Sequence, residues 1–448
     1  MVDLNLQKYP VYKISSIEWL GDIPEHWEVK KLKRLVKKII DGTHFTPNYV
    51  DEGIPFLRVT DIHGSSINMN NVRYISQKEH EQLSKRCNPE KGDVLLSKNG
   101  TIGITKVVDW DCPFSIFVSL CLLKPVFQDI DSYFLSYIFQ GKIIDYQILE
   151  SSKTTSVTNL HLDKIQNLTI VVPPLSEQQA IANFLDDKLA QIDEYIAKKQ
   201  RMIELLKEQK TVIINQAVTK GINPDVPMKY SGVEWLGEIP EHWEAKKLKY
   251  LVEGKLKYGA NEEAKSADKS QPRYIRITDF DGDGKLRDET FRSLEINLAK
   301  DYLLSEGDIL FARSGATVGK TFQFKDYSGL ACFAGYLIKA IPKESIILSD
   351  YLYLFTKSEV YDIWKTSIFI QATIQNIGAD KYSCLSVSLP PISEQKEIVS
   401  FIEKKSEKIE RSLTVIEKEI KLIQEYRTTL ISETVTGKID VRKYHPPQ

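Results

Sequence analysis

Cysteine is scarce in this sequence, and the five cysteines are scattered rather than grouped. No C-x-x-C pair is present, which argues against a structural zinc site or a disulfide framework and favours a reducing compartment such as the cytosol. Long apolar runs are missing too, because the longest, near residues 116–123, is far shorter than the roughly 20 residues that span a bilayer. There is no N-terminal signal peptide either, so the sequence predicts a cytoplasmic protein without a membrane segment.

The common catalytic motifs are missing as well, since G-x-S-x-G, H-E-x-x-H and G-x-G-x-x-G do not occur. Residues 315–321 resemble a phosphate-binding loop, but Ser314 stands where that motif requires its first glycine. Residues 279–284 resemble the start of a calcium loop, but Thr290 occupies the twelfth position, where a bidentate glutamate is needed. The sequence therefore predicts no catalytic centre, no bound cofactor and no metal site on this chain.

An excess of charge of one sign is also missing. Lys and Arg number 60 against 61 Asp and Glu, so the formal net charge is -1. Nucleic-acid-binding domains are usually basic, and the near-neutral total is therefore a caution against such a role. It does not exclude one, because a local basic surface can be offset by acidic residues elsewhere.

What the sequence does contain is an internal duplication. The block at residues 15–36 returns almost unchanged at residues 231–252, and the two copies hold four of the six tryptophans. Repetition this dense predicts two like units related by an approximate two-fold axis. We interpret Trp19, His26 and Trp27 of the first copy as residues of the core and of a turn.

Two long helices with a heptad pattern follow the two units. Apolar residues recur with a period of 3.5 over about five heptads, which is typical of coiled-coil packing. The seam positions are Leu185, Leu189, Ile192, Ile196, Lys199, Ile203, Leu206, Lys210, Ile213 and Ala217 in the first helix, and Ile402, Ser406, Ile409, Leu413, Ile416, Ile420, Ile423, Arg427, Leu430 and Thr434 in the second. Ser176 and Ser393 are the predicted N-caps. Antiparallel packing of the pair would make the chain nearly circular.

These signals divide the chain into five parts. The predicted fold class is α/β (α+β), with two similar domains separated by a long antiparallel two-helix coiled coil, pseudo-two-fold and nearly circular. The predicted boundaries are 1–174 for the first domain, 175–221 for the first helix, 222–391 for the second domain, 392–438 for the second helix, and 439–448 for a tail that packs near the N-terminal block.

Both domains repeat a scaffold with differing polar loops. Strands are predicted at residues 56–61 and 274–279, and again before each Gly-bearing basic loop at residues 97–103 and 312–320. Reading a DNA sequence needs donors and acceptors on loops, with cations that hold the phosphates. The candidate DNA-binding residues are Thr43, His44, Arg58, Lys98, Asn99, Thr101, Lys153, Thr154, Ser156, Thr158 and Asn159 in the first domain, and Arg276, Arg313, Ser314, Thr317, Lys320, Gln371, Thr373, Gln375 and Asn376 in the second.

Over nearly its whole length the chain resembles the specificity subunit of Type I restriction-modification systems. The resemblance is carried by the Trp-Leu-Gly-x-Ile-Pro-Glu-His-Trp blocks at residues 19–27 and 235–243, by the Gly-Asp-Ile-Leu-Phe-Ala-Arg-Ser-Gly run at residues 307–315, and by the Pro-Pro-x-Ser-Glu-Gln starts at Pro173 and Pro390. The first domain departs from the pattern, because it has Ser-Lys-Asn-Gly at residues 97–100 where the second has Ala-Arg-Ser-Gly. The role of that cation is therefore open in the first domain.

The resemblance implies a non-catalytic subunit that reads a bipartite, asymmetric double-stranded DNA target, one half-site per recognition domain. It implies two methyltransferase subunits docked on the coiled coil, which bring S-adenosylmethionine and flip the target adenine, and restriction subunits that use ATP and Mg²⁺ for translocation and cleavage. None of these cofactors is expected on this chain, and no membrane is implied.

Two other functions compete with this interpretation. The first is a methyltransferase or nuclease that acts alone, and the missing motifs argue against it. The second is a coiled-coil protein-interaction scaffold without sequence-specific DNA binding. Divergent loops on a duplicated frame favour DNA readers over a scaffold.

Overall fold

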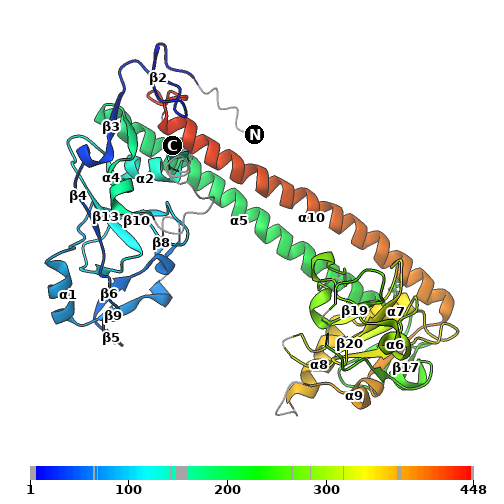
Figure 1. The fold of residues 1–448 in the computed structure, drawn as a ribbon. Coiled ribbons are helices and arrows are strands. Elements are labelled where there is room, and N and C mark those ends of the chain that lie inside the picture. The colour runs from blue at the N-terminus through cyan, green and yellow to red at the C-terminus, as the bar shows by residue number, and fades with distance from the viewer. Residues whose placement is uncertain are drawn as a thin grey trace. The chain divides into compact units, whose positions relative to one another are not determined.

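The computed structural model describes residues 7–63, 66, 67, 69–141, 144, 146, 147, 160–263, 266–282, 284–315, 317–370 and 376–444. The chain divides into two compact units, which are Met1–Lys199 with Glu417–Gln448, and Gln200–Ile416. Each unit combines one α/β domain with one part of each long helix, and Figure 1 labels many of the elements.

The α/β domain of the first unit begins with short strands. Its elements are β1 (Tyr12–Ile14), β2 (Asp22–Pro24), β3 (Glu28–Lys31), η1 (Leu32–Arg34), β4 (Val36–Asp41), β5 (Tyr49–Val50), β6 (Ile54–Leu57), η2 (Val59–Asp61), β7 (Ile62–His63), β8 (Ser66–Ile67), η3 (Met69–Asn71), β9 (Arg73–Ile75), α1 (Gln77–Ser84), β10 (Val94–Ser97), β11 (Thr105–Val107), β12 (Ser115–Ile116), β13 (Leu120–Pro125), α2 (Ser132–Gln140), α4 (Leu162–Gln166) and β14 (Thr169–Val172), where η denotes a 3-10 helix.

The second unit repeats much of this order. Its elements are β15 (Met228–Tyr230), β16 (Glu238–Pro240), β17 (Glu244–Lys247), η4 (Leu248–Tyr250), β18 (Lys257–Tyr258), β19 (Arg273–Ile275), η5 (Ile277–Asp279), η6 (Asp288–Thr290), α6 (Ile296–Ala299), η7 (Lys300–Tyr302), β20 (Ile309–Ala312), β21 (Thr321–Gln323), β22 (Ala331–Phe333), β23 (Leu337–Ala340), α7 (Ser349–Phe355), α8 (Glu359–Ile370), α9 (Ala379–Ser383) and β24 (Ser386–Leu389).

A four-stranded antiparallel sheet organises each domain. Its order is β11-β10-β13-β4 in the first unit and β21-β20-β23-β18 in the second. Strand β10, an inner strand of the first sheet, is buried on both faces. Leu96 of β10 packs toward the helices with Phe134, whereas Leu95 packs on the other face with Leu57 and Leu122. Because successive strand residues alternate in direction, an apolar strand such as β10 can bury both faces at once.

A parallel pair of strands covers the second face in each unit. Strand β6 pairs with β12 in the first domain, and β19 pairs with β22 in the second. The predicted strands at residues 56–61 and 274–279 are therefore only partly correct. The strands end at Leu57 and Ile275, and 3-10 helices η2 and η5 follow. Asp61 and Asp279 cause the change, because each carboxylate accepts a bond from the backbone N–H three residues earlier and so closes a turn.

The two predicted long helices are present. They are α5 (Leu175–Lys220) and α10 (Ile392–Val435). Every predicted seam position from Leu185 to Ala217 and from Ile402 to Thr434 is buried or half-buried, whereas most residues between them are exposed. In the first unit, Asp193 pairs with Arg427 and Lys199 with Glu419. Residue numbers therefore rise along α5 as they fall along α10, so the two helices are antiparallel.

The predicted N-caps are wrong by two residues. Ser176 and Ser393 lie inside the first turn, because the helices start at Leu175 and Ile392. The carbonyl of Pro174 accepts from the N–H of Gln178, and the buried Gln178 amide also bonds the Pro173 carbonyl, 2.9 Å away. The Pro174 carbonyl also accepts from the N–H of Glu177 at 2.9 Å, so a proline carbonyl and not the serine side chain satisfies the N–H groups of this first turn.

The duplicated tryptophan block packs in the core and in a turn. Trp27 is fully buried, and His26 Nε2 lies 2.8 Å from Glu177 Oε2 at the start of α5. In the same unit the end of α10 lies beside β2 (Figure 1). Just after this helix, Lys438 donates to the Leu20 carbonyl at 3.2 Å. The backbone of Gln7 pairs with that of Asp440, so the N-terminal and C-terminal segments meet.

Candidate nucleic-acid interface

Three strand ends come together at one edge of the central sheet in each unit. In the first unit the N–H of Thr43, after β4, bonds the Ile116 carbonyl at 3.0 Å, and the N–H of Lys98, after β10, bonds the Ser119 carbonyl at 3.1 Å. The second unit repeats both bonds with Ala260 to Phe333 at 2.9 Å and Arg313 to Tyr336 at 3.0 Å. The loop after β4 and the loop after β10 therefore both lie against the connection between β12 and β13, and the second unit repeats this arrangement. We call the place where these three loops meet the three-loop junction.

A glycine makes each junction possible. A Cβ atom on Gly42 would lie 2.1 Å from the Ile116 carbonyl oxygen, and one on Gly259 would lie 2.3 Å from that of Phe333. No side chain fits at such distances, so the backbone of the first loop can touch the neighbouring strand only where the residue is glycine. This contact fixes the position of the backbone that carries the Thr43 and His44 side chains.

The two junctions differ in charge. Lys98 is buried in the first unit, and its Nζ lies 3.0 Å from Asp41 Oδ2, with both side chains less than a tenth exposed. In the second unit the strand register places Tyr258 at the position of Asp41, because Cys121 pairs with Asp41 and Ile338 with Tyr258. There the guanidinium of Arg313 lies 5.0 Å from the centre of the Tyr258 ring. One cation is thus neutralised inside the protein and the other rests on an aromatic face.

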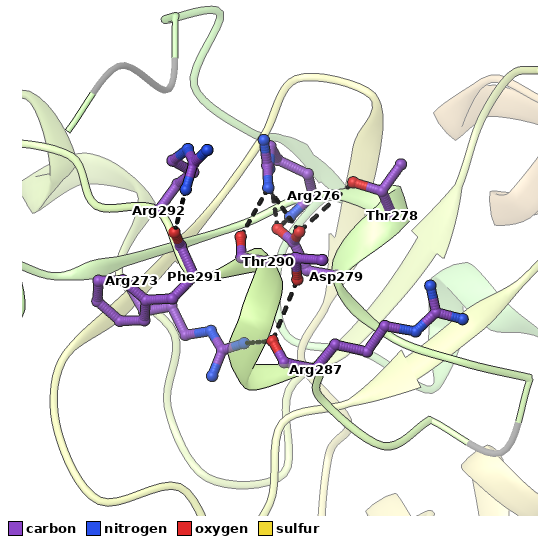
Figure 2. A network of polar contacts seen from close by, with 8 residues as sticks. All are labelled: Arg273, Arg276, Thr278, Asp279, Arg287, Thr290, Phe291 and Arg292. Atoms are coloured by element: carbon purple, nitrogen blue, oxygen red, sulfur yellow. Dashed lines mark hydrogen bonds and ion pairs between the residues drawn. The ribbon is translucent and has the colours of Figure 1, made fainter. Parts of the chain in front are cut away.

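Arg276 is held within the second domain. Its Nε and Nη2 donate to the buried carboxylate of Asp279 at 2.9 and 2.7 Å, and Nη2 also donates to the Thr290 carbonyl at 2.8 Å. Figure 2 shows this clamp, with Thr278 and Arg287 beside it. Bonding to Asp279 raises the pKa of Arg276. The clamp therefore ties η5 to Thr290 at the end of η6.

The first domain repeats this clamp in full. Arg58 donates from Nε and Nη2 to Asp61 at 3.0 and 2.8 Å, and from Nη2 to the Asn71 carbonyl at 2.8 Å. Lys320 also turns inward, since its Nζ donates to the Phe280 carbonyl and lies over the Phe280 ring, and burial lowers its pKa. The structure therefore gives Arg58, Arg276, Lys98 and Lys320 partners inside the protein, and we leave these four out of the interface proposed below.

Most of the remaining described candidates are more accessible. The His44 side chain is 60% exposed and lies 3.5 Å from Asp41, while Thr101, Thr317 and Asn376 are exposed on their loops. Ser314 pairs with Asn376 through the backbone, which brings two predicted loops of the second domain together. Asn99 is half-buried, and Thr43 is buried with its hydroxyl turned toward the backbone of Phe45. The candidates that lie outside the described residues are Lys153, Thr154, Ser156, Thr158, Asn159, Gln371, Thr373 and Gln375.

Two residues of the second junction are absent from the candidates predicted by sequence. Tyr258, at the end of β18, is 43% exposed, and Tyr336, on the connection between β22 and β23, is 64% exposed. Nothing in their local sequence distinguishes them from core tyrosines. Alignment of the two copies would have revealed Tyr258, since it takes the place of Asp41 immediately before the repeated glycine.

The described part of the chain contains no group of three or more His, Cys, Asp or Glu residues that could hold a metal ion. Among the same residues, no helix has the length and apolar character needed to cross a membrane.

Comparisons with known proteins agree on one family. Residues 24–205 and 240–422 both match the model described as the Type I restriction modification DNA specificity domain. The chain is 23% identical to the Type I restriction enzyme MjaVIII specificity subunit of Methanocaldococcus jannaschii, with 94% of each chain covered. It is 23% identical to the EcoKI specificity subunit of Escherichia coli K12, over 86% of this chain and 82% of that one.

A solved structure supports the fold. A chain from a structure of the type I R-M system, solved to explain complex assembly and conformational transition, superposes with a TM-score of 0.71. The match covers 93% of this chain and 99% of that chain at 14% identity, so it concerns the fold alone. The two α/β domains and the pair of long helices are thus a known architecture.

Proposed function

This chain belongs to the family of Type I restriction modification DNA specificity domains, and from that premise we propose that each of its two recognition domains reads one half of a bipartite DNA target. The chain is a non-catalytic specificity subunit, and catalysis lies on partner subunits. The observation that carries the proposal is the repeated three-loop junction, which presents different side chains on the same frame in the two units. Like frames with unlike loops suit two readers of different sequences.

The proposed interface consists of accessible polar residues. Donors and acceptors that reach base edges give specificity, whereas cations near the backbone give affinity. In the first domain the interface comprises His44, Asn99 and Thr101, with the neighbouring Thr43 shaping the turn. In the second it comprises Arg313, Ser314, Thr317 and Asn376. From the sequence alone we add Lys153, Thr154, Ser156, Thr158 and Asn159 to the first half and Gln371, Thr373 and Gln375 to the second.

Base-resolution mapping of methylated adenines tests this function. A methylation-free host would express this chain with its cognate methyltransferase, and a matched host would express the methyltransferase alone. We expect an asymmetric two-part motif that depends on this chain, because each domain contributes one half-site. An Arg313→Ala variant should lower the methylated fraction by weakening recognition of the second domain's half-site alone, with the motif unchanged. If a stable complex forms and no motif appears, the proposal fails and the scaffold alternative gains support.

We further propose that two methyltransferase subunits dock on equivalent exposed apolar residues of the long helices. Leu205 of α5 and Leu422 of α10 occupy the same place in the duplicated frame and are 48% and 54% exposed. In its own unit Leu205 lies near Met202 and Val212 along one helix face, and Leu422 lies near Tyr426. Exposed apolar groups of this kind mark protein interaction surfaces.

The complex should therefore lose one methyltransferase subunit with each single substitution Leu205→Asp or Leu422→Asp, and both subunits with the double substitution. A buried interface core excludes an unpaired carboxylate, which explains the expected loss. Native mass spectrometry would count the subunits. Gln424→Asp, on the other side of the seam on α10, is the matched control and should leave two subunits bound. Full occupancy of the double variant would place the docking surface elsewhere.

S-adenosylmethionine, ATP and Mg²⁺ belong in this proposal to the methyltransferase and restriction subunits. Restriction and translocase subunits would join the same core. We also propose that the assembly acts in the cytoplasm, where its DNA target lies.

A further inference from the structure

We propose that Arg313, framed by Tyr258 and Tyr336, is a contact for one DNA backbone phosphate that the second recognition domain makes and the first does not. The inference rests on the proposed function and adds the chemical nature of one contact and the asymmetry between the half-sites. It assigns roles to the two tyrosines that the loop pattern alone does not suggest.

Geometry first limits what Arg313 can reach. The residue is half-buried, with its Nε enclosed and its guanidinium on the Tyr258 ring at 5.0 Å. Its own N–H bonds the Tyr336 carbonyl at 3.0 Å and its carbonyl accepts from Ile377 at 2.8 Å, so the backbone is tied on both sides. Phosphate oxygens project from the DNA surface, whereas base edges lie deep in a groove. A recessed side chain on a fixed backbone therefore reaches a phosphate oxygen more readily than a base edge.

Charge supports the same ligand. Among the described residues no carboxylate or other acceptor bonds the guanidinium of Arg313, and its Nε is a buried donor without a partner. A buried donor that lacks an acceptor is costly, and an anion at the exposed side of the group would compensate for that cost. Guanidinium groups match the geometry of phosphate oxygens and form charge-assisted bonds with them.

Tyr258 holds the cation in place, and Tyr336 lies on the neighbouring loop. The Tyr258 hydroxyl accepts from the N–H of Ala379 at 3.0 Å, which fixes the ring beneath the guanidinium. Tyr336 is 64% exposed on the tight connection between β22 and β23, next to Gly335, whose N–H bonds the Ala260 carbonyl at 2.7 Å. We assign Tyr258 as a positioning residue and Tyr336 as the exposed wall of the contact.

The first domain lacks the equivalent contact because its cation is already neutralised. Lys98 takes the place of Arg313 but bonds Asp41 at 3.0 Å in the interior, and the buried Ser119 takes the place of Tyr336. Binding through the second half-site should therefore depend more steeply on salt at this contact than binding through the first.

The test uses the assembled complex of this chain with its methyltransferase and a fluorescent duplex carrying the mapped target. Wild-type preference for this duplex over a scrambled duplex tests the proposed function separately. For Arg313→Ala we expect about tenfold weaker binding at about 0.15 M salt, a log–log salt slope shallower by about 0.9, and an unchanged methylated motif. Tyr258→Ala should shift both quantities in the same direction, whereas Tyr258→Phe, which keeps the ring face but loses the bond to Ala379, should lie between wild type and Tyr258→Ala.

Neutral methylphosphonate linkages, placed one at a time across the second half-site, identify the phosphate. Wild type should lose affinity at one linkage, and Arg313→Ala should be insensitive to that same linkage while responding normally elsewhere. Arg411→Ala, an exposed cation on α10, is the control for a general charge effect. Any of three results would overturn the inference. They are an unchanged salt slope in Arg313→Ala, a changed base in its methylated motif, or a loss of affinity in Arg313→Ala at every methylphosphonate linkage that weakens wild type. Hydrogen exchange in β20 and β23 would establish that the variants are folded.

Discussion

A Lys98→Met variant is expected to lose about 3 to 5 kcal/mol of stability in the first recognition domain. Lys98 and Asp41 are 5% exposed each, and Asp41 Oδ1 has no hydrogen-bond partner among the described residues. Removing the lysine leaves a carboxylate buried without its cation, which costs far more than the pair contributes as a whole. The double variant Asp41→Leu with Lys98→Met removes both charges, and we expect it to be close to wild type in stability.

Native-state hydrogen exchange in β4, β10 and β13 would measure this loss, because a two-unit chain need not unfold in one step. Lys91→Met offers a matched control in the same domain, since Lys91 and Asp111 form a pair whose side chains are 60% and 79% exposed. We expect no measurable change there. A stable Lys98→Met protein with weakened DNA binding would show instead that Lys98 reaches the DNA.

The prediction of Lys98 as a DNA contact illustrates what a sequence pattern can and cannot reveal. A cation beside a glycine-bearing loop is visible in the sequence, but its partner Asp41 lies 57 residues away. Only the register of β4 against β13 brings the two together. The clamp of Arg58 on Asp61 is more accessible to sequence reasoning, because the residues are three apart and the same pair recurs at Arg276 and Asp279.

The long helices are predictable because their signal is periodic and local. A seam of 3.5-residue spacing depends only on which residues are apolar, and it recurs in both copies. The helix starts are less predictable, since the buried Gln178 amide bonds both Pro173 and Asp129, which is distant in sequence. Exposed tyrosines such as Tyr336 cannot be foreseen, because exposure is decided by the surrounding loops.

The largest functional effect is expected from shortening both helices by one heptad. Deleting residues 207–213 from α5 and 406–412 from α10 removes matched segments, because Lys210 of one bonds Glu410 of the other at 2.7 Å. Seven residues preserve the seam and shorten each helix by about 10 Å. If the helices set the distance between half-sites, methylation of the original motif should be lost, and the preferred spacer should be about three base pairs shorter at about 3.4 Å each.

Methylated-adenine mapping would reveal both half-sites and the new spacer. The half-site sequences should stay the same, because the recognition loops are untouched. The methylation rate on the new motif should be lower than that of wild type on its own motif. Removing three base pairs from the spacer also rotates one half-site by nearly a third of a helical turn relative to the other. The control is Lys210→Ala with Glu410→Ala, which removes the ion pair at full length and should leave the motif unchanged, because exposed pairs contribute little. An unaltered spacer in the shortened chain would mean that the half-site distance is fixed by the partner subunits instead of by α5 and α10.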